Sequence, residues 1–173
     1  SYTTSDWRVI PADRPAEAPR PTGGRREGVE YALEHGGRSW FIRTNAGGAT
    51  NFKVMLAPDV NPGAWTDWLA HRGSAYVEGV DAFRDFVVVR ERTGGMRRLR
   101  VTELNGGAVH TVALPEAAYG VFPGGNAEYA APAYRFTYSS LVTPPTVYDY
   151  DVRARRLDVR KRTEVPTYDA SRY

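Results

Sequence analysis

The sequence contains no cysteine among its 173 residues. A scaffold held by disulfides and a thiolate nucleophile are therefore both excluded. It also lacks any run of about 18 consecutive apolar residues, which is the signature of a membrane-spanning helix. Residues 1–6 lack the basic, apolar and small-residue order of a secretory leader, so we expect none in this segment.

Histidine is scarce too, with only His35, His71 and His110 in the chain. These three lie far apart and show none of the short spacings that metal ligands adopt. We therefore predict neither a metal site nor a cofactor. Arginine, by contrast, supplies nearly all of the positive charge, because Lys53 and Lys161 are the only lysines.

The net charge is +3, from 23 basic and 20 acidic residues. An arginine-rich surface suits phosphate groups, so a nucleic-acid interface is one interpretation. A phosphate-binding face should segregate its charges, however, and here Asp151, Asp158 and Glu164 are interleaved with the C-terminal arginines. The pattern favours a mixed surface, and we expect neither a nucleic-acid nor a membrane partner.

Six Gly-Gly pairs separate short apolar runs along the chain. Glycine reaches positive φ without steric cost, so such pairs favour tight turns between strands. The runs fall into three sets of about four strands, whose second strands begin at Ser39, Asp85 and Tyr134, 46 and 49 residues apart. A period in the forties with four strands per unit is typical of β-propeller blades.

The second strands are apolar on both faces, as in residues 85–90, where Phe86 and Val88 alternate with Val87 and Val89. Such a strand must be covered on both sides, as neighbouring blades would do. A β-sandwich also has short strands and glycine turns; the regular period favours the propeller.

We predict an all-β fold: a partial propeller of about three four-stranded antiparallel blades plus one stray outer strand. Residues 1–173 form one propeller fragment, and residues 11–21 read as a loop. The blades span roughly 28–71, 75–115 and 118–165, and residues 6–11 form the outer strand of a preceding blade.

The most specific segment runs from Tyr134 to Val152, YRFTYSSLVTPPTVYDYDV, followed by a TEVP motif. Tyr148, Tyr150 and Val152 alternate with acidic residues, which is the period of a half-buried strand. This segment resembles the last propeller blade of the prolyl oligopeptidase family of serine peptidases, and within it the oligopeptidase B (protease II) group. Earlier segments such as GVEYALEHGGRSWFIRTNAGGATNF and YVEGVDAFRDFVVVRERTGGMRRLRV resemble its preceding blades.

The resemblance implies a seven-bladed propeller capping an α/β-hydrolase domain that cleaves short peptides after Arg or Lys. It implies a cytoplasmic location, with the periplasm as the alternative. Residues 166–173 would then begin the linker to that domain. The family's nucleophile lies in a G-x-S-x-G turn. Neither Ser39 nor Ser74 has that context, so we assign no catalytic residue and expect the chain alone to be inactive.

The sequence does predict a role for the propeller in controlling the access of peptides to the hydrolase domain. The first strand of each blade should face the central channel, and these strands carry Glu30, Glu34, Glu78 and Asp81. Carboxylates there would attract basic peptides. Alternatively, they lie on loops and pair with arginines such as Arg84.

A second class of function is a stand-alone propeller that binds protein partners. In either case three blades leave apolar faces uncovered, so we expect the chain to self-associate.

Overall fold

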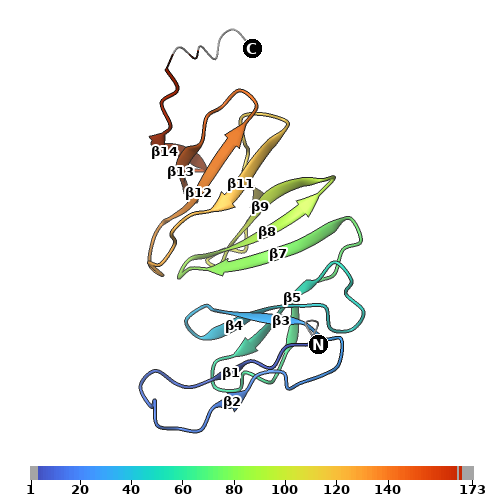
Figure 1. Ribbon diagram of the computed structural model, residues 1–173. Coiled ribbons are helices and arrows are strands. Elements are labelled where there is room, and N and C mark those ends of the chain that lie inside the picture. Colours follow the sequence, from blue (N-terminus) through green and yellow to red (C-terminus); the bar gives the residue numbers. More distant parts are fainter. Residues whose placement is uncertain (1–3, 167, 169–173) are drawn as a thin grey trace. The chain divides into compact units, whose positions relative to one another are not determined.

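The computed structural model describes residues 4–166 and 168. All regular secondary structure in this part is strand, so the predicted all-β class is confirmed (Figure 1). Three four-stranded sheets follow one another along the chain, and within each sheet the strands are ordered as they are in the sequence. No helix in the described part is long and apolar enough to cross a membrane.

The first sheet contains β3 (Tyr31–His35), β4 (Ser39–Thr44), β5 (Lys53–Pro58) and β6 (Thr66–Leu69). The second contains β7 (Ala75–Ala82), β8 (Phe86–Thr93), β9 (Met96–Glu103) and β10 (Val109–Thr111). The third contains β11 (Tyr119–Pro123), β12 (Ala133–Ser140), β13 (Thr146–Asp151) and β14 (Arg156–Arg162).

A short two-stranded sheet precedes these three, formed by β1 (Arg8–Val9) and β2 (Arg20–Pro21). The expected stray strand is therefore present, but the segment expected to be a loop ends in a strand that pairs with it. Thr22 reinforces this pairing, because its hydroxyl donates a hydrogen bond to the Trp7 carbonyl at 2.8 Å. The proline-rich sequence between the two strands did not reveal this pairing.

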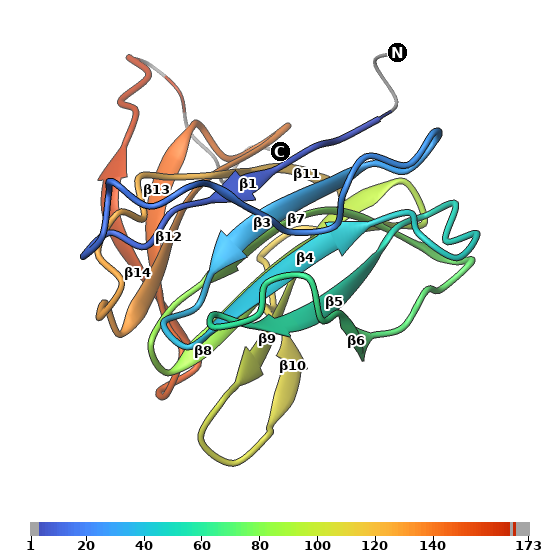
Figure 2. The same ribbon diagram turned by 90° about the horizontal axis from the view of Figure 1, so that it is seen from below.

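The chain divides into two compact units, with the boundary between Ala82 and Phe83. In the first unit, one face of the first sheet buries Tyr31, Ile42 and Ala57 against Trp40 and other apolar side chains. Figure 2 shows β3, β4 and β5 of this sheet side by side. The first strand of the second sheet, β7, which lies at one edge of that sheet, also contacts β3 and β4 within this unit.

The core of the second unit lies between strands β8–β10 and the third sheet. It contains Val88, Leu99 and Val101 from one side and Tyr134, Phe136, Tyr138, Tyr148 and Tyr150 from the other. The expectation that β8 is apolar on both faces is confirmed, since the residues from Phe86 to Val89 are at most 2% exposed.

The β8–β9 hairpin shows how glycine sets the register of these strands. Thr93 pairs with Met96, and the two residues between them are Gly94 and Gly95. Their φ values are +58° and +79°. A two-residue hairpin turn with positive φ at both positions is the type I′ geometry, which favours glycine strongly.

Candidate functional site

The carboxylates expected to line a channel lie on or beside the first strands of two sheets. Glu34 is on β3, Glu78 and Asp81 are on β7, Glu30 immediately precedes β3, and all four are half-buried. Glu34 accepts a hydrogen bond from the Ala82 amide at 3.4 Å, so it bridges β3 and β7.

The four carboxylates do not form one cluster. Glu30 and Glu34 lie at opposite ends of β3, while Glu78 and Asp81 lie an odd number of residues apart on β7 and so face opposite sides of that strand. Arg84, proposed as their alternative partner, binds Asp85 at 3.2 Å. Their place along a channel stays a prediction.

The histidines do not assemble a serine-based catalytic site in the described part of the chain. His35 lies 3.4 Å from Asp59, His71 accepts a hydrogen bond from the Asn51 amide, and the Nε2 atom of His110 lies 2.8 Å from the Tyr150 hydroxyl. Among residues 4–166 and 168, no group of three or more His, Asp or Glu side chains could hold a metal ion.

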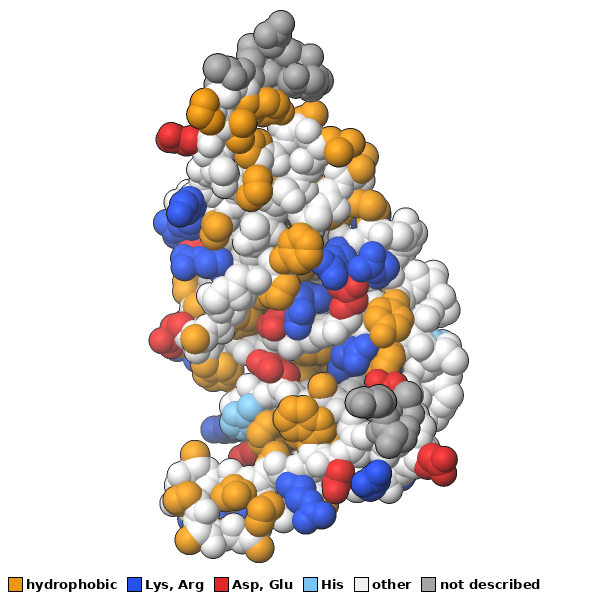
Figure 3. All heavy atoms as spheres, in the orientation of Figure 1, with side chains coloured by type: hydrophobic (Ala, Val, Ile, Leu, Met, Phe, Trp, Pro, Cys, Tyr) orange, Lys and Arg blue, Asp and Glu red, His pale blue; other side chains and the backbone are white. Residues whose placement is uncertain are grey.

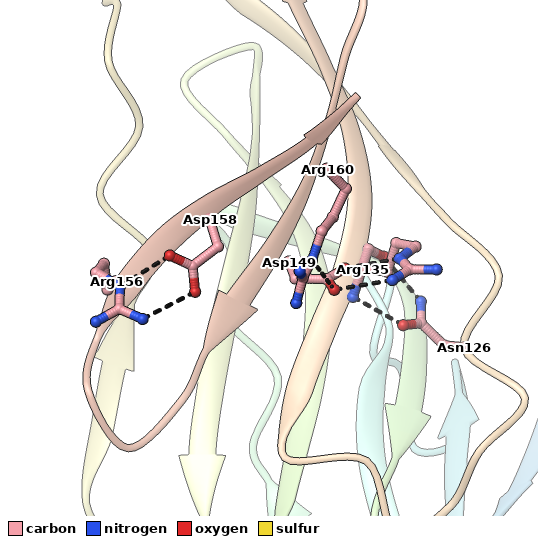
Figure 4. A network of polar contacts seen from close by, with 6 residues as sticks. All are labelled: Asn126, Arg135, Asp149, Arg156, Asp158 and Arg160. Atoms are coloured by element: carbon pink, nitrogen blue, oxygen red, sulfur yellow. Dashed lines mark hydrogen bonds and ion pairs between the residues drawn. The ribbon is translucent and has the colours of Figure 1, made fainter. Parts of the chain in front are cut away.

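A network of polar contacts lies on the third sheet, and Figure 4 shows its residues. Arg135 and Asp149 alternate along their strands with Tyr134, Phe136 and Tyr148 of the core, so the network lies on the face that points away from that core. Arg135 on β12 is directly opposite Asp149 on β13. Its Nε and Nη2 atoms bind the two carboxylate oxygens of Asp149 at 2.6 and 2.8 Å. From β14, Arg160 adds a third bond at 2.7 Å to one of these oxygens.

An irregularity in strand pairing brings Arg160 into this cluster. The register between β13 and β14 shifts at Val147 and Tyr148, which face Lys161 and Val159 and leave Arg160 without an opposite residue. A β-bulge of this kind redirects side chains. It gives Asp149, whose side chain is only 9% exposed, the second guanidinium that a buried carboxylate needs.

The electrostatics of the cluster follow from these contacts. The hydrogen bond from Arg135 lowers the pKa of Asp149, and Arg160 adds to the effect although partial burial opposes it. The same bond raises the pKa of Arg135. Asp149 is therefore ionised throughout the physiological range, and the cluster is a permanent ionic network.

A loop holds the backbone of Arg135 in place. The amide side chain of Asn126 accepts a hydrogen bond from the Arg135 amide at 2.8 Å and donates one to its carbonyl at 2.9 Å. Gly124 packs against the same residue so closely that a Cβ there would lie 2.8 Å from the Arg135 Cγ. Position 124 therefore requires glycine, and the loop fixes the backbone of Arg135 from two sides.

The end of the third sheet near residues 140–145 is tied together by Glu116. Its carboxylate accepts hydrogen bonds from the hydroxyls of Tyr138 and Thr143. A cavity of about 610 Å³ lies beside this turn, between residues 142–144 on one side and residues 162–165 with Tyr168 on the other. Leu141, at the tip of the turn, is 96% exposed.

A second cavity, of about 540 Å³, lies at the other end of the strands in the second unit. Asp85, Glu103 and Arg153 contribute charged groups of both signs to its lining. Nearby, burial and Arg155 lower the pKa of His110, while Glu103 acts in the opposite direction. The mixed charges of this cavity point to no single ligand class.

The sequence reasoning missed Arg135, Asp149 and Arg160 as a cluster. A signal for the first two was present, because Arg135 interrupts a strand of aromatic residues and Asp149 alternates with tyrosines. The pairing of Arg135 with Asp149 depends on the strand register, and the contact of Arg160 depends on a bulge. The alternation of residues in the sequence specifies neither the register nor the bulge.

Figure 3 shows acidic and basic side chains interspersed on the face it displays, as the mixed-surface interpretation expects.

Residues 1–163 match the family model described as "Prolyl oligopeptidase, N-terminal beta-propeller domain". The chain belongs to the prolyl oligopeptidase family. The three four-stranded sheets are thus blades of its propeller, as the sequence resemblance predicted.

Dipeptidyl aminopeptidase BI of Pseudoxanthomonas mexicana is 38% identical over 100% of this chain and 24% of that protein. Protease 2 of Moraxella lacunata is 26% identical over 88% of this chain and 22% of its own length. Oligopeptidase B from Leishmania major superposes with a TM-score of 0.87 at 25% identity, covering 98% of this chain and 26% of that one. The chain thus spans about a quarter of the length of these relatives.

Proposed function

We propose that this chain is the non-catalytic propeller portion of a serine oligopeptidase, which restricts the access of peptides to a hydrolase domain in the same parent polypeptide. Family membership supports the class of protein, and the lack of a G-x-S-x-G turn in residues 1–173 is consistent with a nucleophile in another domain of the parent. The observation that carries the gating role is the position of Glu34, Glu78 and Asp81 on the first, edge strands of two sheets.

The proposed parent reaction is hydrolysis of short peptides after Arg or Lys, and the proposed location is the cytoplasm. The Pseudoxanthomonas relative is named a dipeptidyl aminopeptidase and the Leishmania protein an oligopeptidase. Both names describe enzymes that hydrolyse peptide bonds, but the names differ in the peptide product that they indicate. Carboxylates facing a channel would raise the local concentration of cationic peptides, which favours the basic preference.

The test uses the parent enzyme with Glu78→Gln and Asp81→Asn together. We expect kcat/KM for an arginine-containing fluorogenic peptide to fall about threefold to tenfold, with less effect at high salt, because steering by charge is screened. A neutral peptide should be unaffected. Asp67→Asn is the matched control, since Asp67 lies on the outer strand β6. Equal losses for both peptides, or none, would contradict the gating role.

We also propose that the isolated chain self-associates through faces that the rest of the ring would cover. Exposed apolar surface of blade size is rare on soluble monomers, and open strand edges favour pairing. Sedimentation velocity over a concentration series tests this. A monomer at every concentration that binds no hydrophobic dye would contradict it.

A further inference from the structure

The cavity of about 540 Å³ in the second unit carries charges of both signs. The signs alone select no ligand, but the placement of the charged groups does. One wall comes from the second sheet, where Asp85 precedes β8 and Glu103 ends β9. The other wall comes from the third sheet, where Val152 and Arg153 follow β13. The acidic groups therefore lie on one wall and the basic group on the other.

Backbone hydrogen bonds hold the segments that form these walls. The Leu104 amide donates to the Asp85 carbonyl at 2.8 Å, which fixes the end of β9 beside the start of β8. The Arg84 amide donates to the Tyr129 carbonyl at 2.9 Å, which joins the same end of the second sheet to the loop before β12. Both walls thus belong to the second unit, and hydrogen bonds connect them.

The carboxylate of Glu103 lacks hydrogen-bond donors. Its side chain is only 28% exposed. The nitrogens of Arg155 and His110 approach its Oε1 atom at 3.7 and 3.8 Å, which is too far for a hydrogen bond. Within residues 4–166 and 168, no other group donates to this carboxylate. A half-buried carboxylate with open acceptor sites favours a ligand that supplies N–H donors.

Arg153, on the other wall, offers the opposite chemistry. Its side chain is exposed, and no carboxylate in the described part of the chain forms an ion pair with it. The planar guanidinium fork binds a carboxylate through two parallel hydrogen bonds. This wall therefore offers donors, whereas the wall of Glu103 offers acceptors.

The two walls together select a ligand that carries both charges. A cation would be repelled by Arg153 and an anion by Glu103, while an uncharged ligand would displace water from both groups without pairing them. Asp85 adds negative charge to the acidic wall, although it already accepts hydrogen bonds from Asn105 and Arg84. Glu103 is thus the carboxylate with acceptor sites to spare.

The separation of the charges favours a short peptide over a free amino acid. The ammonium and carboxylate of an amino acid share one carbon atom, whereas Glu103 and Arg153 stand on different walls. Phe86, Pro132 and Val152 add apolar surface to the lining, which suits peptide side chains. The volume of the cavity falls within the range of about 300–1,000 Å³ that is usual for small-molecule sites.

We propose that this cavity binds a short peptide whose two termini are free, with its ammonium group on Glu103 and its carboxylate on Arg153. Hydrolysis of a peptide bond creates one free ammonium and one free carboxylate, so this ligand class includes products of the proposed parent reaction. The inference goes beyond the proposed function, because none of the carboxylates assigned to the channel lines this cavity and no hydrolysis is required.

The experiment titrates the 173-residue chain by calorimetry with three forms of one dipeptide: free Ala-Leu, N-acetyl-Ala-Leu and Ala-Leu amide. We expect the free form to bind and each blocked form to bind at least about fivefold more weakly, because each loses one charge-assisted pair. Free alanine, which cannot reach both walls, should bind no more tightly than the blocked forms.

The imidazole NMR signals of the three histidines locate the site. His110 lies 3.8 Å from Glu103, so its signals should shift as the free dipeptide saturates the chain. His35 and His71 belong to the first unit and serve as internal references that should not shift.

Variants assign each terminus of the peptide to its partner. Glu103→Gln should bind the free and N-acetylated forms equally, because the partner of the ammonium group is gone. Arg153→Gln should bind the free and amidated forms equally, for the corresponding reason at the carboxylate. Arg156→Gln is the matched control: Arg156 pairs with Asp158 outside the lining, so this variant should keep the full preference for the free form.

No binding, equal binding of the three forms, alanine binding as tight as that of the dipeptide, or binding without a shift at His110 would overturn the proposal. Unchanged affinity of the free dipeptide in both Glu103→Gln and Arg153→Gln would do the same. The comparison of peptide forms on the original chain needs no variant, so it decides the question even if a variant fails to fold. No catalysis is measured, so this result is separate from that of the kcat/KM experiment on the channel carboxylates.

Discussion

The two faces of β12 and β13 are built from alternating residues of the same two strands, yet they differ in chemistry. One face places Tyr134, Phe136 and Tyr148 in an aromatic core in which none is more than 6% exposed. The other places Arg135 against Asp149, held by three charged hydrogen bonds that include the one from Arg160. A period of two residues is enough to separate a packing surface from an ionic one.

The comparison also shows how each face satisfies its polar atoms. The aromatic face uses tyrosines whose hydroxyls reach partners at its edges, as Tyr138 reaches Glu116 and Tyr150 reaches His110. On the ionic face, Arg135 and Arg160 bind the buried carboxylate of Asp149, and both arginine side chains remain partly exposed to water. Both arrangements avoid the penalty for an unpaired buried polar group.

The largest expected effect is on the aromatic side. Val88→Asp would place an unpaired carboxylate in a fully buried position against this core. The cost is several kcal/mol, comparable to the stability of a whole domain, so we expect unfolding or aggregation. Thermal unfolding followed by circular dichroism measures it. The matched control is Thr137→Asp, which adds the same charge on the ionic face of β12, and similar melting temperatures for both variants would contradict the comparison.

The next effect is on the ionic face. Asp149→Asn keeps the shape of the side chain but removes the charge shared by Arg135 and Arg160, so we expect a loss of about 1–3 kcal/mol. Chemical denaturation measures the free energy of unfolding. Val147→Ala, a smaller change on the same strand, controls for disturbance of β13. A stability equal to that of the original chain would show that Asp149 is screened by solvent despite its burial.

Acid should lower the free energy of unfolding through His110, beside the aromatic core, and through Asp149, on the ionic face, but in different pH ranges. The pKa of His110 is lowered from its ordinary value of 6.5, so the unfolded state takes up a proton first, and stability falls as the pH drops below about 6.5. The pKa of Asp149 is lowered from 3.8, so its contribution is complete above that value and is lost as the pH falls through the folded-state pKa.

We therefore expect two acid steps in the free energy of unfolding, measured from pH 8 to pH 2. His110→Gln should remove the upper step and leave the lower one, whereas Asp149→Asn should do the reverse. His35→Gln is the control for the upper step, because His35 is exposed on the first sheet. If the upper step persists in His110→Gln, it does not come from the imidazole that burial and Arg155 keep neutral, and the assignment of this step to His110 is wrong.

Much of this arrangement follows from the sequence alone. The period of the second strands and the double-faced apolar run around Val88 predicted the blades, because a strand without a polar face can exist only between two layers. The alternation of Tyr148 and Tyr150 with Asp149 predicted which side chains share a face. The pairing of residues 8–9 with residues 20–21 was not predictable, since the segment between them carries no strand pattern.

The ionic cluster could not be predicted from the same signals. Arg135 meets Asp149 only if the β12–β13 register is known, and a slip of one residue would place the two on opposite faces. Arg160 joins them only because of a bulge in the pairing of β14. Alternation gives the face of each residue, whereas turn lengths and local irregularities decide which residues meet.

The smallest expected effect separates two ion pairs that look alike. Arg156 binds Asp158 at 2.8 and 3.1 Å, much as Arg135 binds Asp149, but both partners come from β14 and face water. An exposed pair gains little, because solvent screens its attraction and ordering two side chains costs entropy. We expect Asp158→Asn to leave the free energy of unfolding unchanged within error, whereas Asp149→Asn lowers it. Equal losses in the two variants would show that the register-paired carboxylate derives no advantage from burial or from its second arginine.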